Sequence, residues 1–189
     1  FLFFLIVIIS SFNSKYAYGS AMEIYRFINL GLIFYITVNF ITDEKDIKSA
    51  LNLILAAGVC VSIFGILQYL GFIDKPWWDN SKFLSATYVN HNHFAGYLEL
   101  LIPVPIGMIL SEKETYKKVL YVCSFLILSI AFLLSMSRGG WFALSISMVF
   151  MTIVIFRKGR ARFIVLIATL VFITLMIFAR LEKAMIRKD

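Results

Sequence analysis

Residues 50–71 read ALNLILAAGVCVSIFGILQYLG, a run without a single charged side chain. A helix of about twenty apolar residues is long enough to cross the hydrocarbon core of a bilayer. The run does not alternate between polar and apolar residues, as a strand of a membrane barrel would. This stretch therefore predicts a membrane-spanning helix.

The rest of the chain repeats this pattern. Of its 189 residues, 61% are hydrophobic and 15% are charged, whereas soluble domains have about 45–50% and 25%. We predict an all-α, polytopic transmembrane helical bundle of about seven membrane helices, separated by short hydrophilic breaks. The segments are 1–12, 24–41, 50–71, 93–110, 119–136, 141–156 and 163–179.

Features of both ends suggest a piece of a longer protein. The chain opens inside the apolar run FLFFLIVIISSF, which we interpret as the remainder of a membrane helix. A signal peptide would carry a basic leader and a small-residue cleavage site, and this run shows neither, so we do not interpret it as a signal peptide.

Cys60 and Cys123 lie within apolar runs, and we expect both to be small buried hydrophobic residues rather than metal ligands.

The formal net charge of +7 is interpreted as a means of orienting the chain in the membrane, not of binding nucleic acid, because cytoplasmic loops are enriched in Lys and Arg. Placing the break 157–162 (RKGRAR) in the cytoplasm also puts 42–48 and 111–118 there, so the more basic breaks share that side. Residues 180–189 would then lie outside with four basic residues, which suits only a large translocated loop. We assign 1–179 to part of a larger membrane domain and 180–189 to the start of a large periplasmic loop.

This orientation puts two polar clusters at the same external surface, NHNH at 90–93 and SMSRGGW at 135–141. The second lies within LLSMSRGGWFAL (133–144) and contains Arg138. This arginine would cost about 2.5–3.5 kcal/mol in hydrocarbon and so needs a cavity or a partner. Ser137 is a candidate cap of a helix that begins near Trp141, and Gly139 and Gly140 leave backbone N–H groups approachable. A guanidinium beside a helix N-terminus suits phosphate. The alternative is an interfacial Arg that extends to the lipid headgroups, with glycines serving a tight turn.

The first cluster, around Asn90, His91, Asn92 and His93, leads into an apolar segment. On a helix, Asn92, Gly96, Glu99 and Pro103 fall within one narrow polar arc, which predicts a face inside the bundle or against a water-filled cleft. Glu99 would adjust such a cleft or hydrogen-bond a neighbouring helix. The His-x-His pair is a weak metal signal, and we expect hydrogen bonding at a wet interface instead.

The stretches TYVNHNHFAGYLELLIPV (87–104) and LLSMSRGGWFAL together resemble the O-antigen ligase and O-antigen polymerase superfamily. Members often show Asn-x-Asn-x-Phe-Ala-x-Tyr-Leu before one helix and Ser-Arg-Gly at the start of another. The first pattern is matched by Asn90, Asn92, Phe94, Ala95, Tyr97 and Leu98, and the second by Ser137, Arg138 and Gly139. His91 stands where the family often has proline.

The resemblance implies a multi-pass bacterial inner-membrane protein whose periplasmic face transfers a glycan from undecaprenyl diphosphate to a sugar hydroxyl. It also implies no nucleotide sugar, no metal and a large periplasmic loop after these helices, so this piece alone is expected to be inactive. We expect Arg138 to hold the diphosphate and the Asn90–His93 rim to shape the cleft. A transporter of a small anion such as inorganic carbon, and a structural bundle, are the alternatives.

Overall fold

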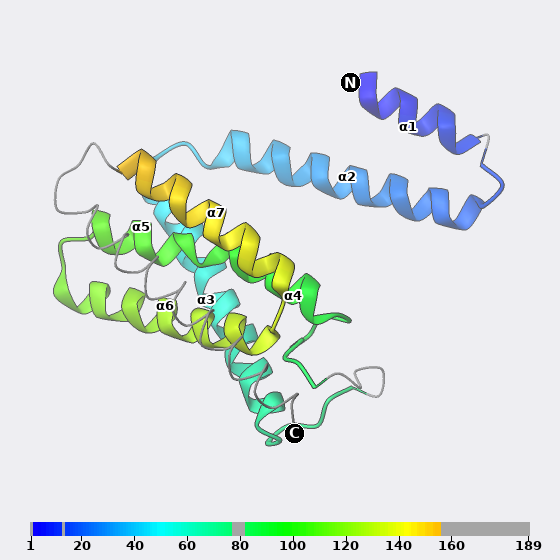
Figure 1. Cartoon of the computed structure of the whole chain (residues 1–189). Helices are drawn as coiled ribbons and strands as arrows, with labels where there is room; N and C mark the ends of the chain where they lie inside the picture. The colour runs from blue at the N-terminus through cyan, green and yellow to red at the C-terminus, as the bar shows by residue number, and fades with distance from the viewer. Residues whose placement is uncertain (1, 13, 77–81, 156–189) are drawn as a thin grey trace. The chain divides into compact units, whose positions relative to one another are not determined.

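The computed structural model describes residues 2–12, 14–76 and 82–155 (Figure 1). Every helix or strand assigned within these ranges is an α-helix, so the predicted all-α class is confirmed for the described chain. The helices are α1 (Leu2–Phe12), α2 (Ala17–Phe40), α3 (Glu44–Tyr69), α4 (His91–Leu101), α5 (Pro103–Ser111), α6 (Thr115–Ser135) and α7 (Arg138–Ile155).

Four helical stretches of the described chain are long and apolar enough to cross a membrane: Tyr18–Phe40, Glu44–Tyr69, His91–Ser111 and Thr115–Ser135. The described part of α7 is a shorter apolar helix, and α1 has 11 residues. The described chain thus has fewer spans than the seven we predicted. The predicted segment 163–179, the basic break 157–162 and residues 180–189 lie outside the described residues.

The chain divides into two compact units, residues 1–50 and 51–189. In the first unit α1 packs against α2. A hollow of about 440 Å³ in this unit is lined by several serines, including Ser10 and Ser20, and by Glu23. Glu23 forms an exposed ion pair with Arg26 at 3.0 Å. Both polar motifs belong to the second unit.

Several helices begin before the residue that the apolar runs predicted, α2 at Ala17 rather than 24 among them, and one predicted helix is divided. The expected helix 93–110 is divided into α4 and α5 at Ile102, because proline has no N–H and crowds the carbonyl four residues earlier. Pro103 and Pro105 therefore deprive two carbonyls of α4 of helical partners. Ile102 keeps helical dihedral angles (φ −57°, ψ −37°), and its N–H still donates to Leu98 O at 2.9 Å. The two helices consequently form one span.

α3 begins at Glu44, well before the predicted start at residue 50. Glu44 and Asp46 occupy its first turn, where negative charge is stabilised by the partial positive charge of the helix N-terminus. The Asp46 carboxylate also accepts a hydrogen bond from the N–H of Asp43 at 3.4 Å. The sequence break 42–48 that we took for a loop is therefore largely the polar first turn of a helix.

The core of the second unit forms where α4, α5, α6 and α7 pack together. Its largest buried side chains are apolar, and a hydrogen bond from Tyr121 Oη of α6 to Asn52 Oδ1 of α3, 3.0 Å long, ties α3 to this group. Cys60 and Cys123 are exposed, so the expectation that both are buried is wrong. The largest buried residues include Phe94, Leu98, Leu128, Phe132, Leu144 and Met148.

Small residues line the buried face of α3. Gly58, Ser62 and Gly65 are all buried. Leu101 of α4 fills the space above Gly58, and Ala86 covers Gly65. Small residues let membrane helices approach closely, which matters because packing rather than the hydrophobic effect drives their association.

We predict that Gly65→Ala destabilises the second unit by about 1–3 kcal/mol, the usual cost of overpacking. The new Cβ would lie 2.7 Å from Ala86 Cβ, which has no torsion by which to move away. The matched control is Gly107→Ala in α5, where no atom lies within 4 Å of the new Cβ. Thermal unfolding in detergent should show a lower Tm for Gly65→Ala and no loss for Gly107→Ala. Equal Tm values would contradict the close contact.

Candidate functional site

The two polar motifs lie at the same end of the second unit. α4 and α7 begin there and α6 ends there (Figure 1). Gly140 of α7 is a point of close approach, because a Cβ on it would lie 3.0 Å from Ala95 Cβ of α4 and 3.3 Å from the Phe132 ring of α6. The Asn-His motif and the Ser-Arg-Gly motif are therefore joined through direct helix packing.

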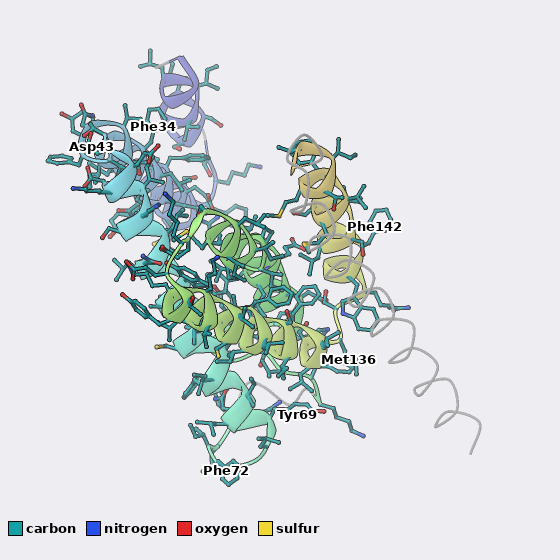
Figure 2. The ribbon with its side chains drawn as sticks, turned by 90° about the vertical axis from the view of Figure 1, so that its left-hand side faces the viewer. Phe34, Asp43, Tyr69, Phe72, Met136 and Phe142 are labelled. Carbon is teal, nitrogen blue, oxygen red and sulfur yellow. The ribbon has the colours of Figure 1, made fainter. Side chains whose placement is uncertain are left out.

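A two-residue turn connects α6 to α7. Met136, labelled in Figure 2, ends α6 in the left-handed conformation (φ 52°). Ser137 caps α7 as its position predicted: its Oγ accepts from the N–H of Gly140 at 3.2 Å, and its carbonyl accepts from the N–H of Trp141 at 3.0 Å. α7 thus begins at Arg138, not near Trp141, and the two glycines belong to its first turn.

Arg138 is the first residue of α7, and its side chain is exposed. It makes no hydrogen bond or ion pair with any described residue. A cation at this position is disfavoured by the partial positive charge of the helix N-terminus. Both charges attract an anion, so an anion would relieve the conflict.

Backbone donors accompany the guanidinium. The first N–H groups of a helix have no intrahelical partner, and Ser137 occupies only that of Gly140. Gly139 is exposed, with no atom within 4 Å of the place where a Cβ would stand. The start of α7 can therefore offer charge and backbone N–H groups to the oxygens of a phosphate group.

The Asn-His rim forms the start of α4. Asn90 is the N-cap, and its Oδ1 accepts from the N–H of Asn92 at 2.8 Å. The half-buried ring of His91 lies 4.8 Å from that of Phe83, centroid to centroid. Asn92 and His93 are exposed. Asn90 thus has a structural role as a cap, while Asn92 and His93 present their side chains outward.

The loop before the rim docks on the bundle, a feature that the sequence did not reveal. Leu84, Ser85 and Ala86 are buried, and the N–H of Leu84 donates to Leu134 O of α6 at 3.1 Å. Ala86 has a positive φ of 51°, a conformation that alanine rarely adopts. No glycine or asparagine signals this turn, so residue pattern alone could not locate it.

Three aromatic rings close to the rim in sequence pack together. The Tyr88 ring lies 5.7 Å from that of Phe94 and 5.6 Å from that of Tyr97, measured between centroids. These are ordinary distances for interacting aromatic pairs. Burial, and to a lesser degree the neighbouring Tyr97, raise the pKa of Tyr88 above its usual value. The cluster connects the docked loop to the first turns of α4.

The predicted polar arc of α4 does not form its main packing face. Phe94, Ala95 and Leu98 are fully buried, whereas Asn92 is exposed and Gly96, Glu99 and Pro103 are half-buried. Ala95 faces α7, and each residue advances about 100° around a helix. The arc therefore lies next to Ala95, along the edge of the α4–α7 contact. Glu99 Oε2 is buried there without a hydrogen-bond partner among the described residues.

The described residues contain no group of three or more His, Cys, Asp and Glu side chains that could hold a metal ion. Comparison of the chain with protein-family models, curated proteins and solved structures found no match. The fold alone defines the class: a helical protein with several helices of membrane-spanning length and an arginine, Arg138, at the start of α7.

We predict that Gly140→Leu disrupts this end of the unit, while Gly139→Leu is tolerated. The side chain at 140 would meet Ala95 and Phe132, and the one at 139 would enter open space. Overpacking at 140 should cost about 1–3 kcal/mol or more. Unfolding of the two variants in detergent provides the measurement, and comparable Tm values would contradict the α4–α7 contact.

We predict that Ser137→Ala lowers stability by about 0.5–2 kcal/mol, because the N–H of Gly140 loses its cap. Ser145→Ala on the same helix is the control, since its hydroxyl only donates to Trp141 O within the helix and its loss should change little. Hydrogen exchange at the first turn of α7 should accelerate in Ser137→Ala alone. Unchanged exchange would show that the cap does not hold this turn.

Proposed function

We propose that the chain is part of an O-antigen ligase or polymerase, a membrane transferase in the bacterial inner membrane. It would move a glycan from undecaprenyl diphosphate to a sugar hydroxyl at the periplasmic face, within a bundle of about seven membrane helices. The observation that carries this proposal is the guanidinium of Arg138 on the first turn of α7, which has no partner among the described residues. This turn packs beside the helix that bears the Asn90–His93 rim.

The charge at this site suits a lipid diphosphate. Arg138 supplies a planar pair of donors that matches phosphate oxygens, and the start of α7 adds backbone N–H groups. The apolar lengths of α3, α4–α5 and α6 would hold the helices in the bilayer where the polyprenyl chain resides. Asn92 and His93, both exposed, would contact the sugar next to the diphosphate.

The proposed reaction exchanges one bond to the anomeric carbon for another. The acceptor hydroxyl oxygen bonds to that carbon, the carbon–oxygen bond to the diphosphate breaks, and the hydroxyl proton passes to a base. The leaving diphosphate gains negative charge as the bond breaks. Arg138 and the α7 N-terminus would stabilise that charge, a contribution that increases in the transition state. The half-buried Glu99 would adjust the polarity of the surroundings of the substrate along α4.

A membrane transporter of a small anion is the second candidate, and one observation favours it. The α4–α5 span is interrupted near Glu99, and transporters often place binding sites at broken helices. However, Ile102 keeps helical dihedral angles, so the break does not unwind the backbone. Uptake of labelled bicarbonate into vesicles would favour the transporter, whereas consumption of labelled undecaprenyl-diphosphate glycan would favour the transferase.

We predict that Arg138→Ala weakens binding of undecaprenyl diphosphate by about tenfold or more, because a charge-assisted hydrogen bond contributes about 1.5–3 kcal/mol. Binding would be measured by native mass spectrometry of the chain in nanodiscs, with undecaprenol as the uncharged lipid. Glycan transfer by an intact protein that contains this sequence should fall at least as much.

The control is Arg26→Ala, which removes an exposed arginine already paired with Glu23 and should leave lipid binding unchanged. Arg138→Lys should restore part of the binding, because it keeps the charge but not the planar pair of donors. If Arg138→Ala binds the diphosphate lipid and transfers glycan as the parent does, at equal abundance in the membrane, Arg138 has no part in the mechanism.

A further inference from the structure

The outer face of α7 carries a hollow lined mostly by apolar side chains. Phe142 is 71% exposed and Phe150 is 67% exposed, and Figure 2 shows Phe142 on the side of α7 turned away from α4, α5 and α6. Leu144 and Met148, on the opposite side, are buried in the core. Because α7 packs against the membrane-length α4–α5 stretch, the hollow would lie at the depth of the bilayer hydrocarbon. Its volume is about 380 Å³, and it is lined by Phe142, Ser145, Ile146, Val149, Phe150 and Ile153.

Arg138 stands at the head of this hollow. At about 100° per residue, Phe142, Ser145 and Val149 all lie within about 40° of Arg138 around the helix axis. Side chains on a helix tilt toward its N-terminus, so the guanidinium extends away from the hollow toward the membrane surface. The Arg138 side chain is exposed and has no hydrogen bond or ion pair with a described residue. One stripe of α7 thus carries a cation at its start and an apolar hollow after it.

The length of the hollow fits the chain of a single lipid. From Phe142 to Ile153 the helix rises about 16 Å, which is close to half of a hydrocarbon core about 30 Å thick. The hollow is therefore about as deep as one leaflet. A molecule that reaches one leaflet deep, with an apolar chain and an anionic head, matches both the hollow and the charge of Arg138.

We infer that α7 binds one anionic glycerophospholipid of the bilayer, with its phosphate on Arg138 and one acyl chain in the hollow. The planar donors of a guanidinium match phosphate oxygens in pairs. Every bilayer lipid has apolar chains, so the selectivity must come from the head. A zwitterionic head also holds a phosphate, but its ammonium group cancels the net charge that Arg138 attracts.

This lipid site has a consequence for the transfer of glycan. The diphosphate lipid of the proposed reaction would need the same guanidinium, so a bound phospholipid would occupy Arg138 until that donor displaces it. The consequence rests on the proposed function, whereas the phospholipid site itself does not.

The test uses the complete chain in phosphatidylcholine nanodiscs that contain a photoactivatable lipid. The probe has a diazirine in its acyl chain and either a phosphatidylglycerol or a phosphatidylcholine head. After illumination, proteolysis and mass spectrometry locate the label. We expect the phosphatidylglycerol probe to label residues 142–153 about fivefold more than the phosphatidylcholine probe, the factor that one arginine contributes near an anionic lipid surface.

Two kinds of variant test the head and the chain separately. Arg138→Gln should reduce labelling by the phosphatidylglycerol probe to the level of the phosphatidylcholine probe. Ser145→Leu fills the hollow and should reduce labelling of 142–153 by both probes. Val149→Phe fills the same hollow, so the test of the chain survives if Ser145→Leu is not recovered.

Matched controls should leave the labelling unchanged. Arg26→Gln removes an exposed arginine that is paired with Glu23. Ser124→Leu enlarges a serine of α6 whose hydroxyl, like that of Ser145, donates to the carbonyl four residues earlier. Equal labelling by the two probes, a preference that survives Arg138→Gln, or labelling that both hollow-filling variants leave intact would each overturn the inference.

Unlabelled undecaprenyl diphosphate separates this inference from the proposed function. We expect it to displace the phosphatidylglycerol probe from 142–153. If the probe depends on Arg138 and undecaprenyl diphosphate does not compete, the phospholipid site stands and the role of Arg138 in binding the donor fails. If phosphatidylglycerol is not preferred but Arg138→Ala still weakens binding of undecaprenyl diphosphate, the phospholipid site fails and the proposed function stands.

Discussion

The absence of a side chain at Gly140 is the constraint on which this end of the molecule depends. At 3.0 Å from a hypothetical Cβ, Ala95 leaves no room for any other residue type without a shift of α4 or α7. The same glycine donates its N–H to Ser137, which starts α7 immediately after the turn from α6. Packing and capping at one residue therefore bring the Ser-Arg-Gly motif beside the Asn-His motif. The neighbouring Gly139 meets no such contact, so two adjacent glycines have different physical reasons to be small.

The apolar runs were sufficient to predict an all-α chain and the approximate positions of α1 to α7, because uninterrupted hydrophobic length depends on composition alone. They could not predict where helices begin. Acidic residues that suit the start of α3 look like a loop when only hydrophobicity is considered. Pro103 and Pro105 divide the 93–110 segment, because proline interrupts a helix even where the hydrophobic run continues. A charged first turn accounts for the error at the start of α3, and a proline break accounts for the division of the 93–110 segment.

The parts of the candidate site that depend on local chemistry could be predicted from the sequence, and the parts that depend on distant contacts could not. Ser137 as a cap follows from local chemistry, since serine before a helix is a strong signal. The docked loop at Leu84–Ala86 depends on contacts with Leu134 and Gly65, which are distant in sequence. No local pattern indicates a left-handed Ala86. Helical periodicity puts the polar residues of α4 on one arc, but it cannot tell which neighbour that arc faces. The contact of Ala95 with Gly140 places the arc beside α7.

Some buried polar atoms have no hydrogen-bond partner in the described chain, and packing explains some of them better than others. Ser62 Oγ and Ser129 Oγ are such atoms, together with Glu99 Oε2 and Trp141 Nε1. An unpaired hydroxyl costs little compared with an unpaired carboxylate, which in a low-dielectric region must be neutralised or paired. Glu99 therefore cannot be explained by packing alone, any more than Arg138 can at a helix start that repels it. The two residues lie on adjacent parallel helices at different depths, so a ligand entering from this end would meet the cation first and the acid deeper along α4. That order suits an anionic headgroup held at the surface, with the carboxyl group kept away from it.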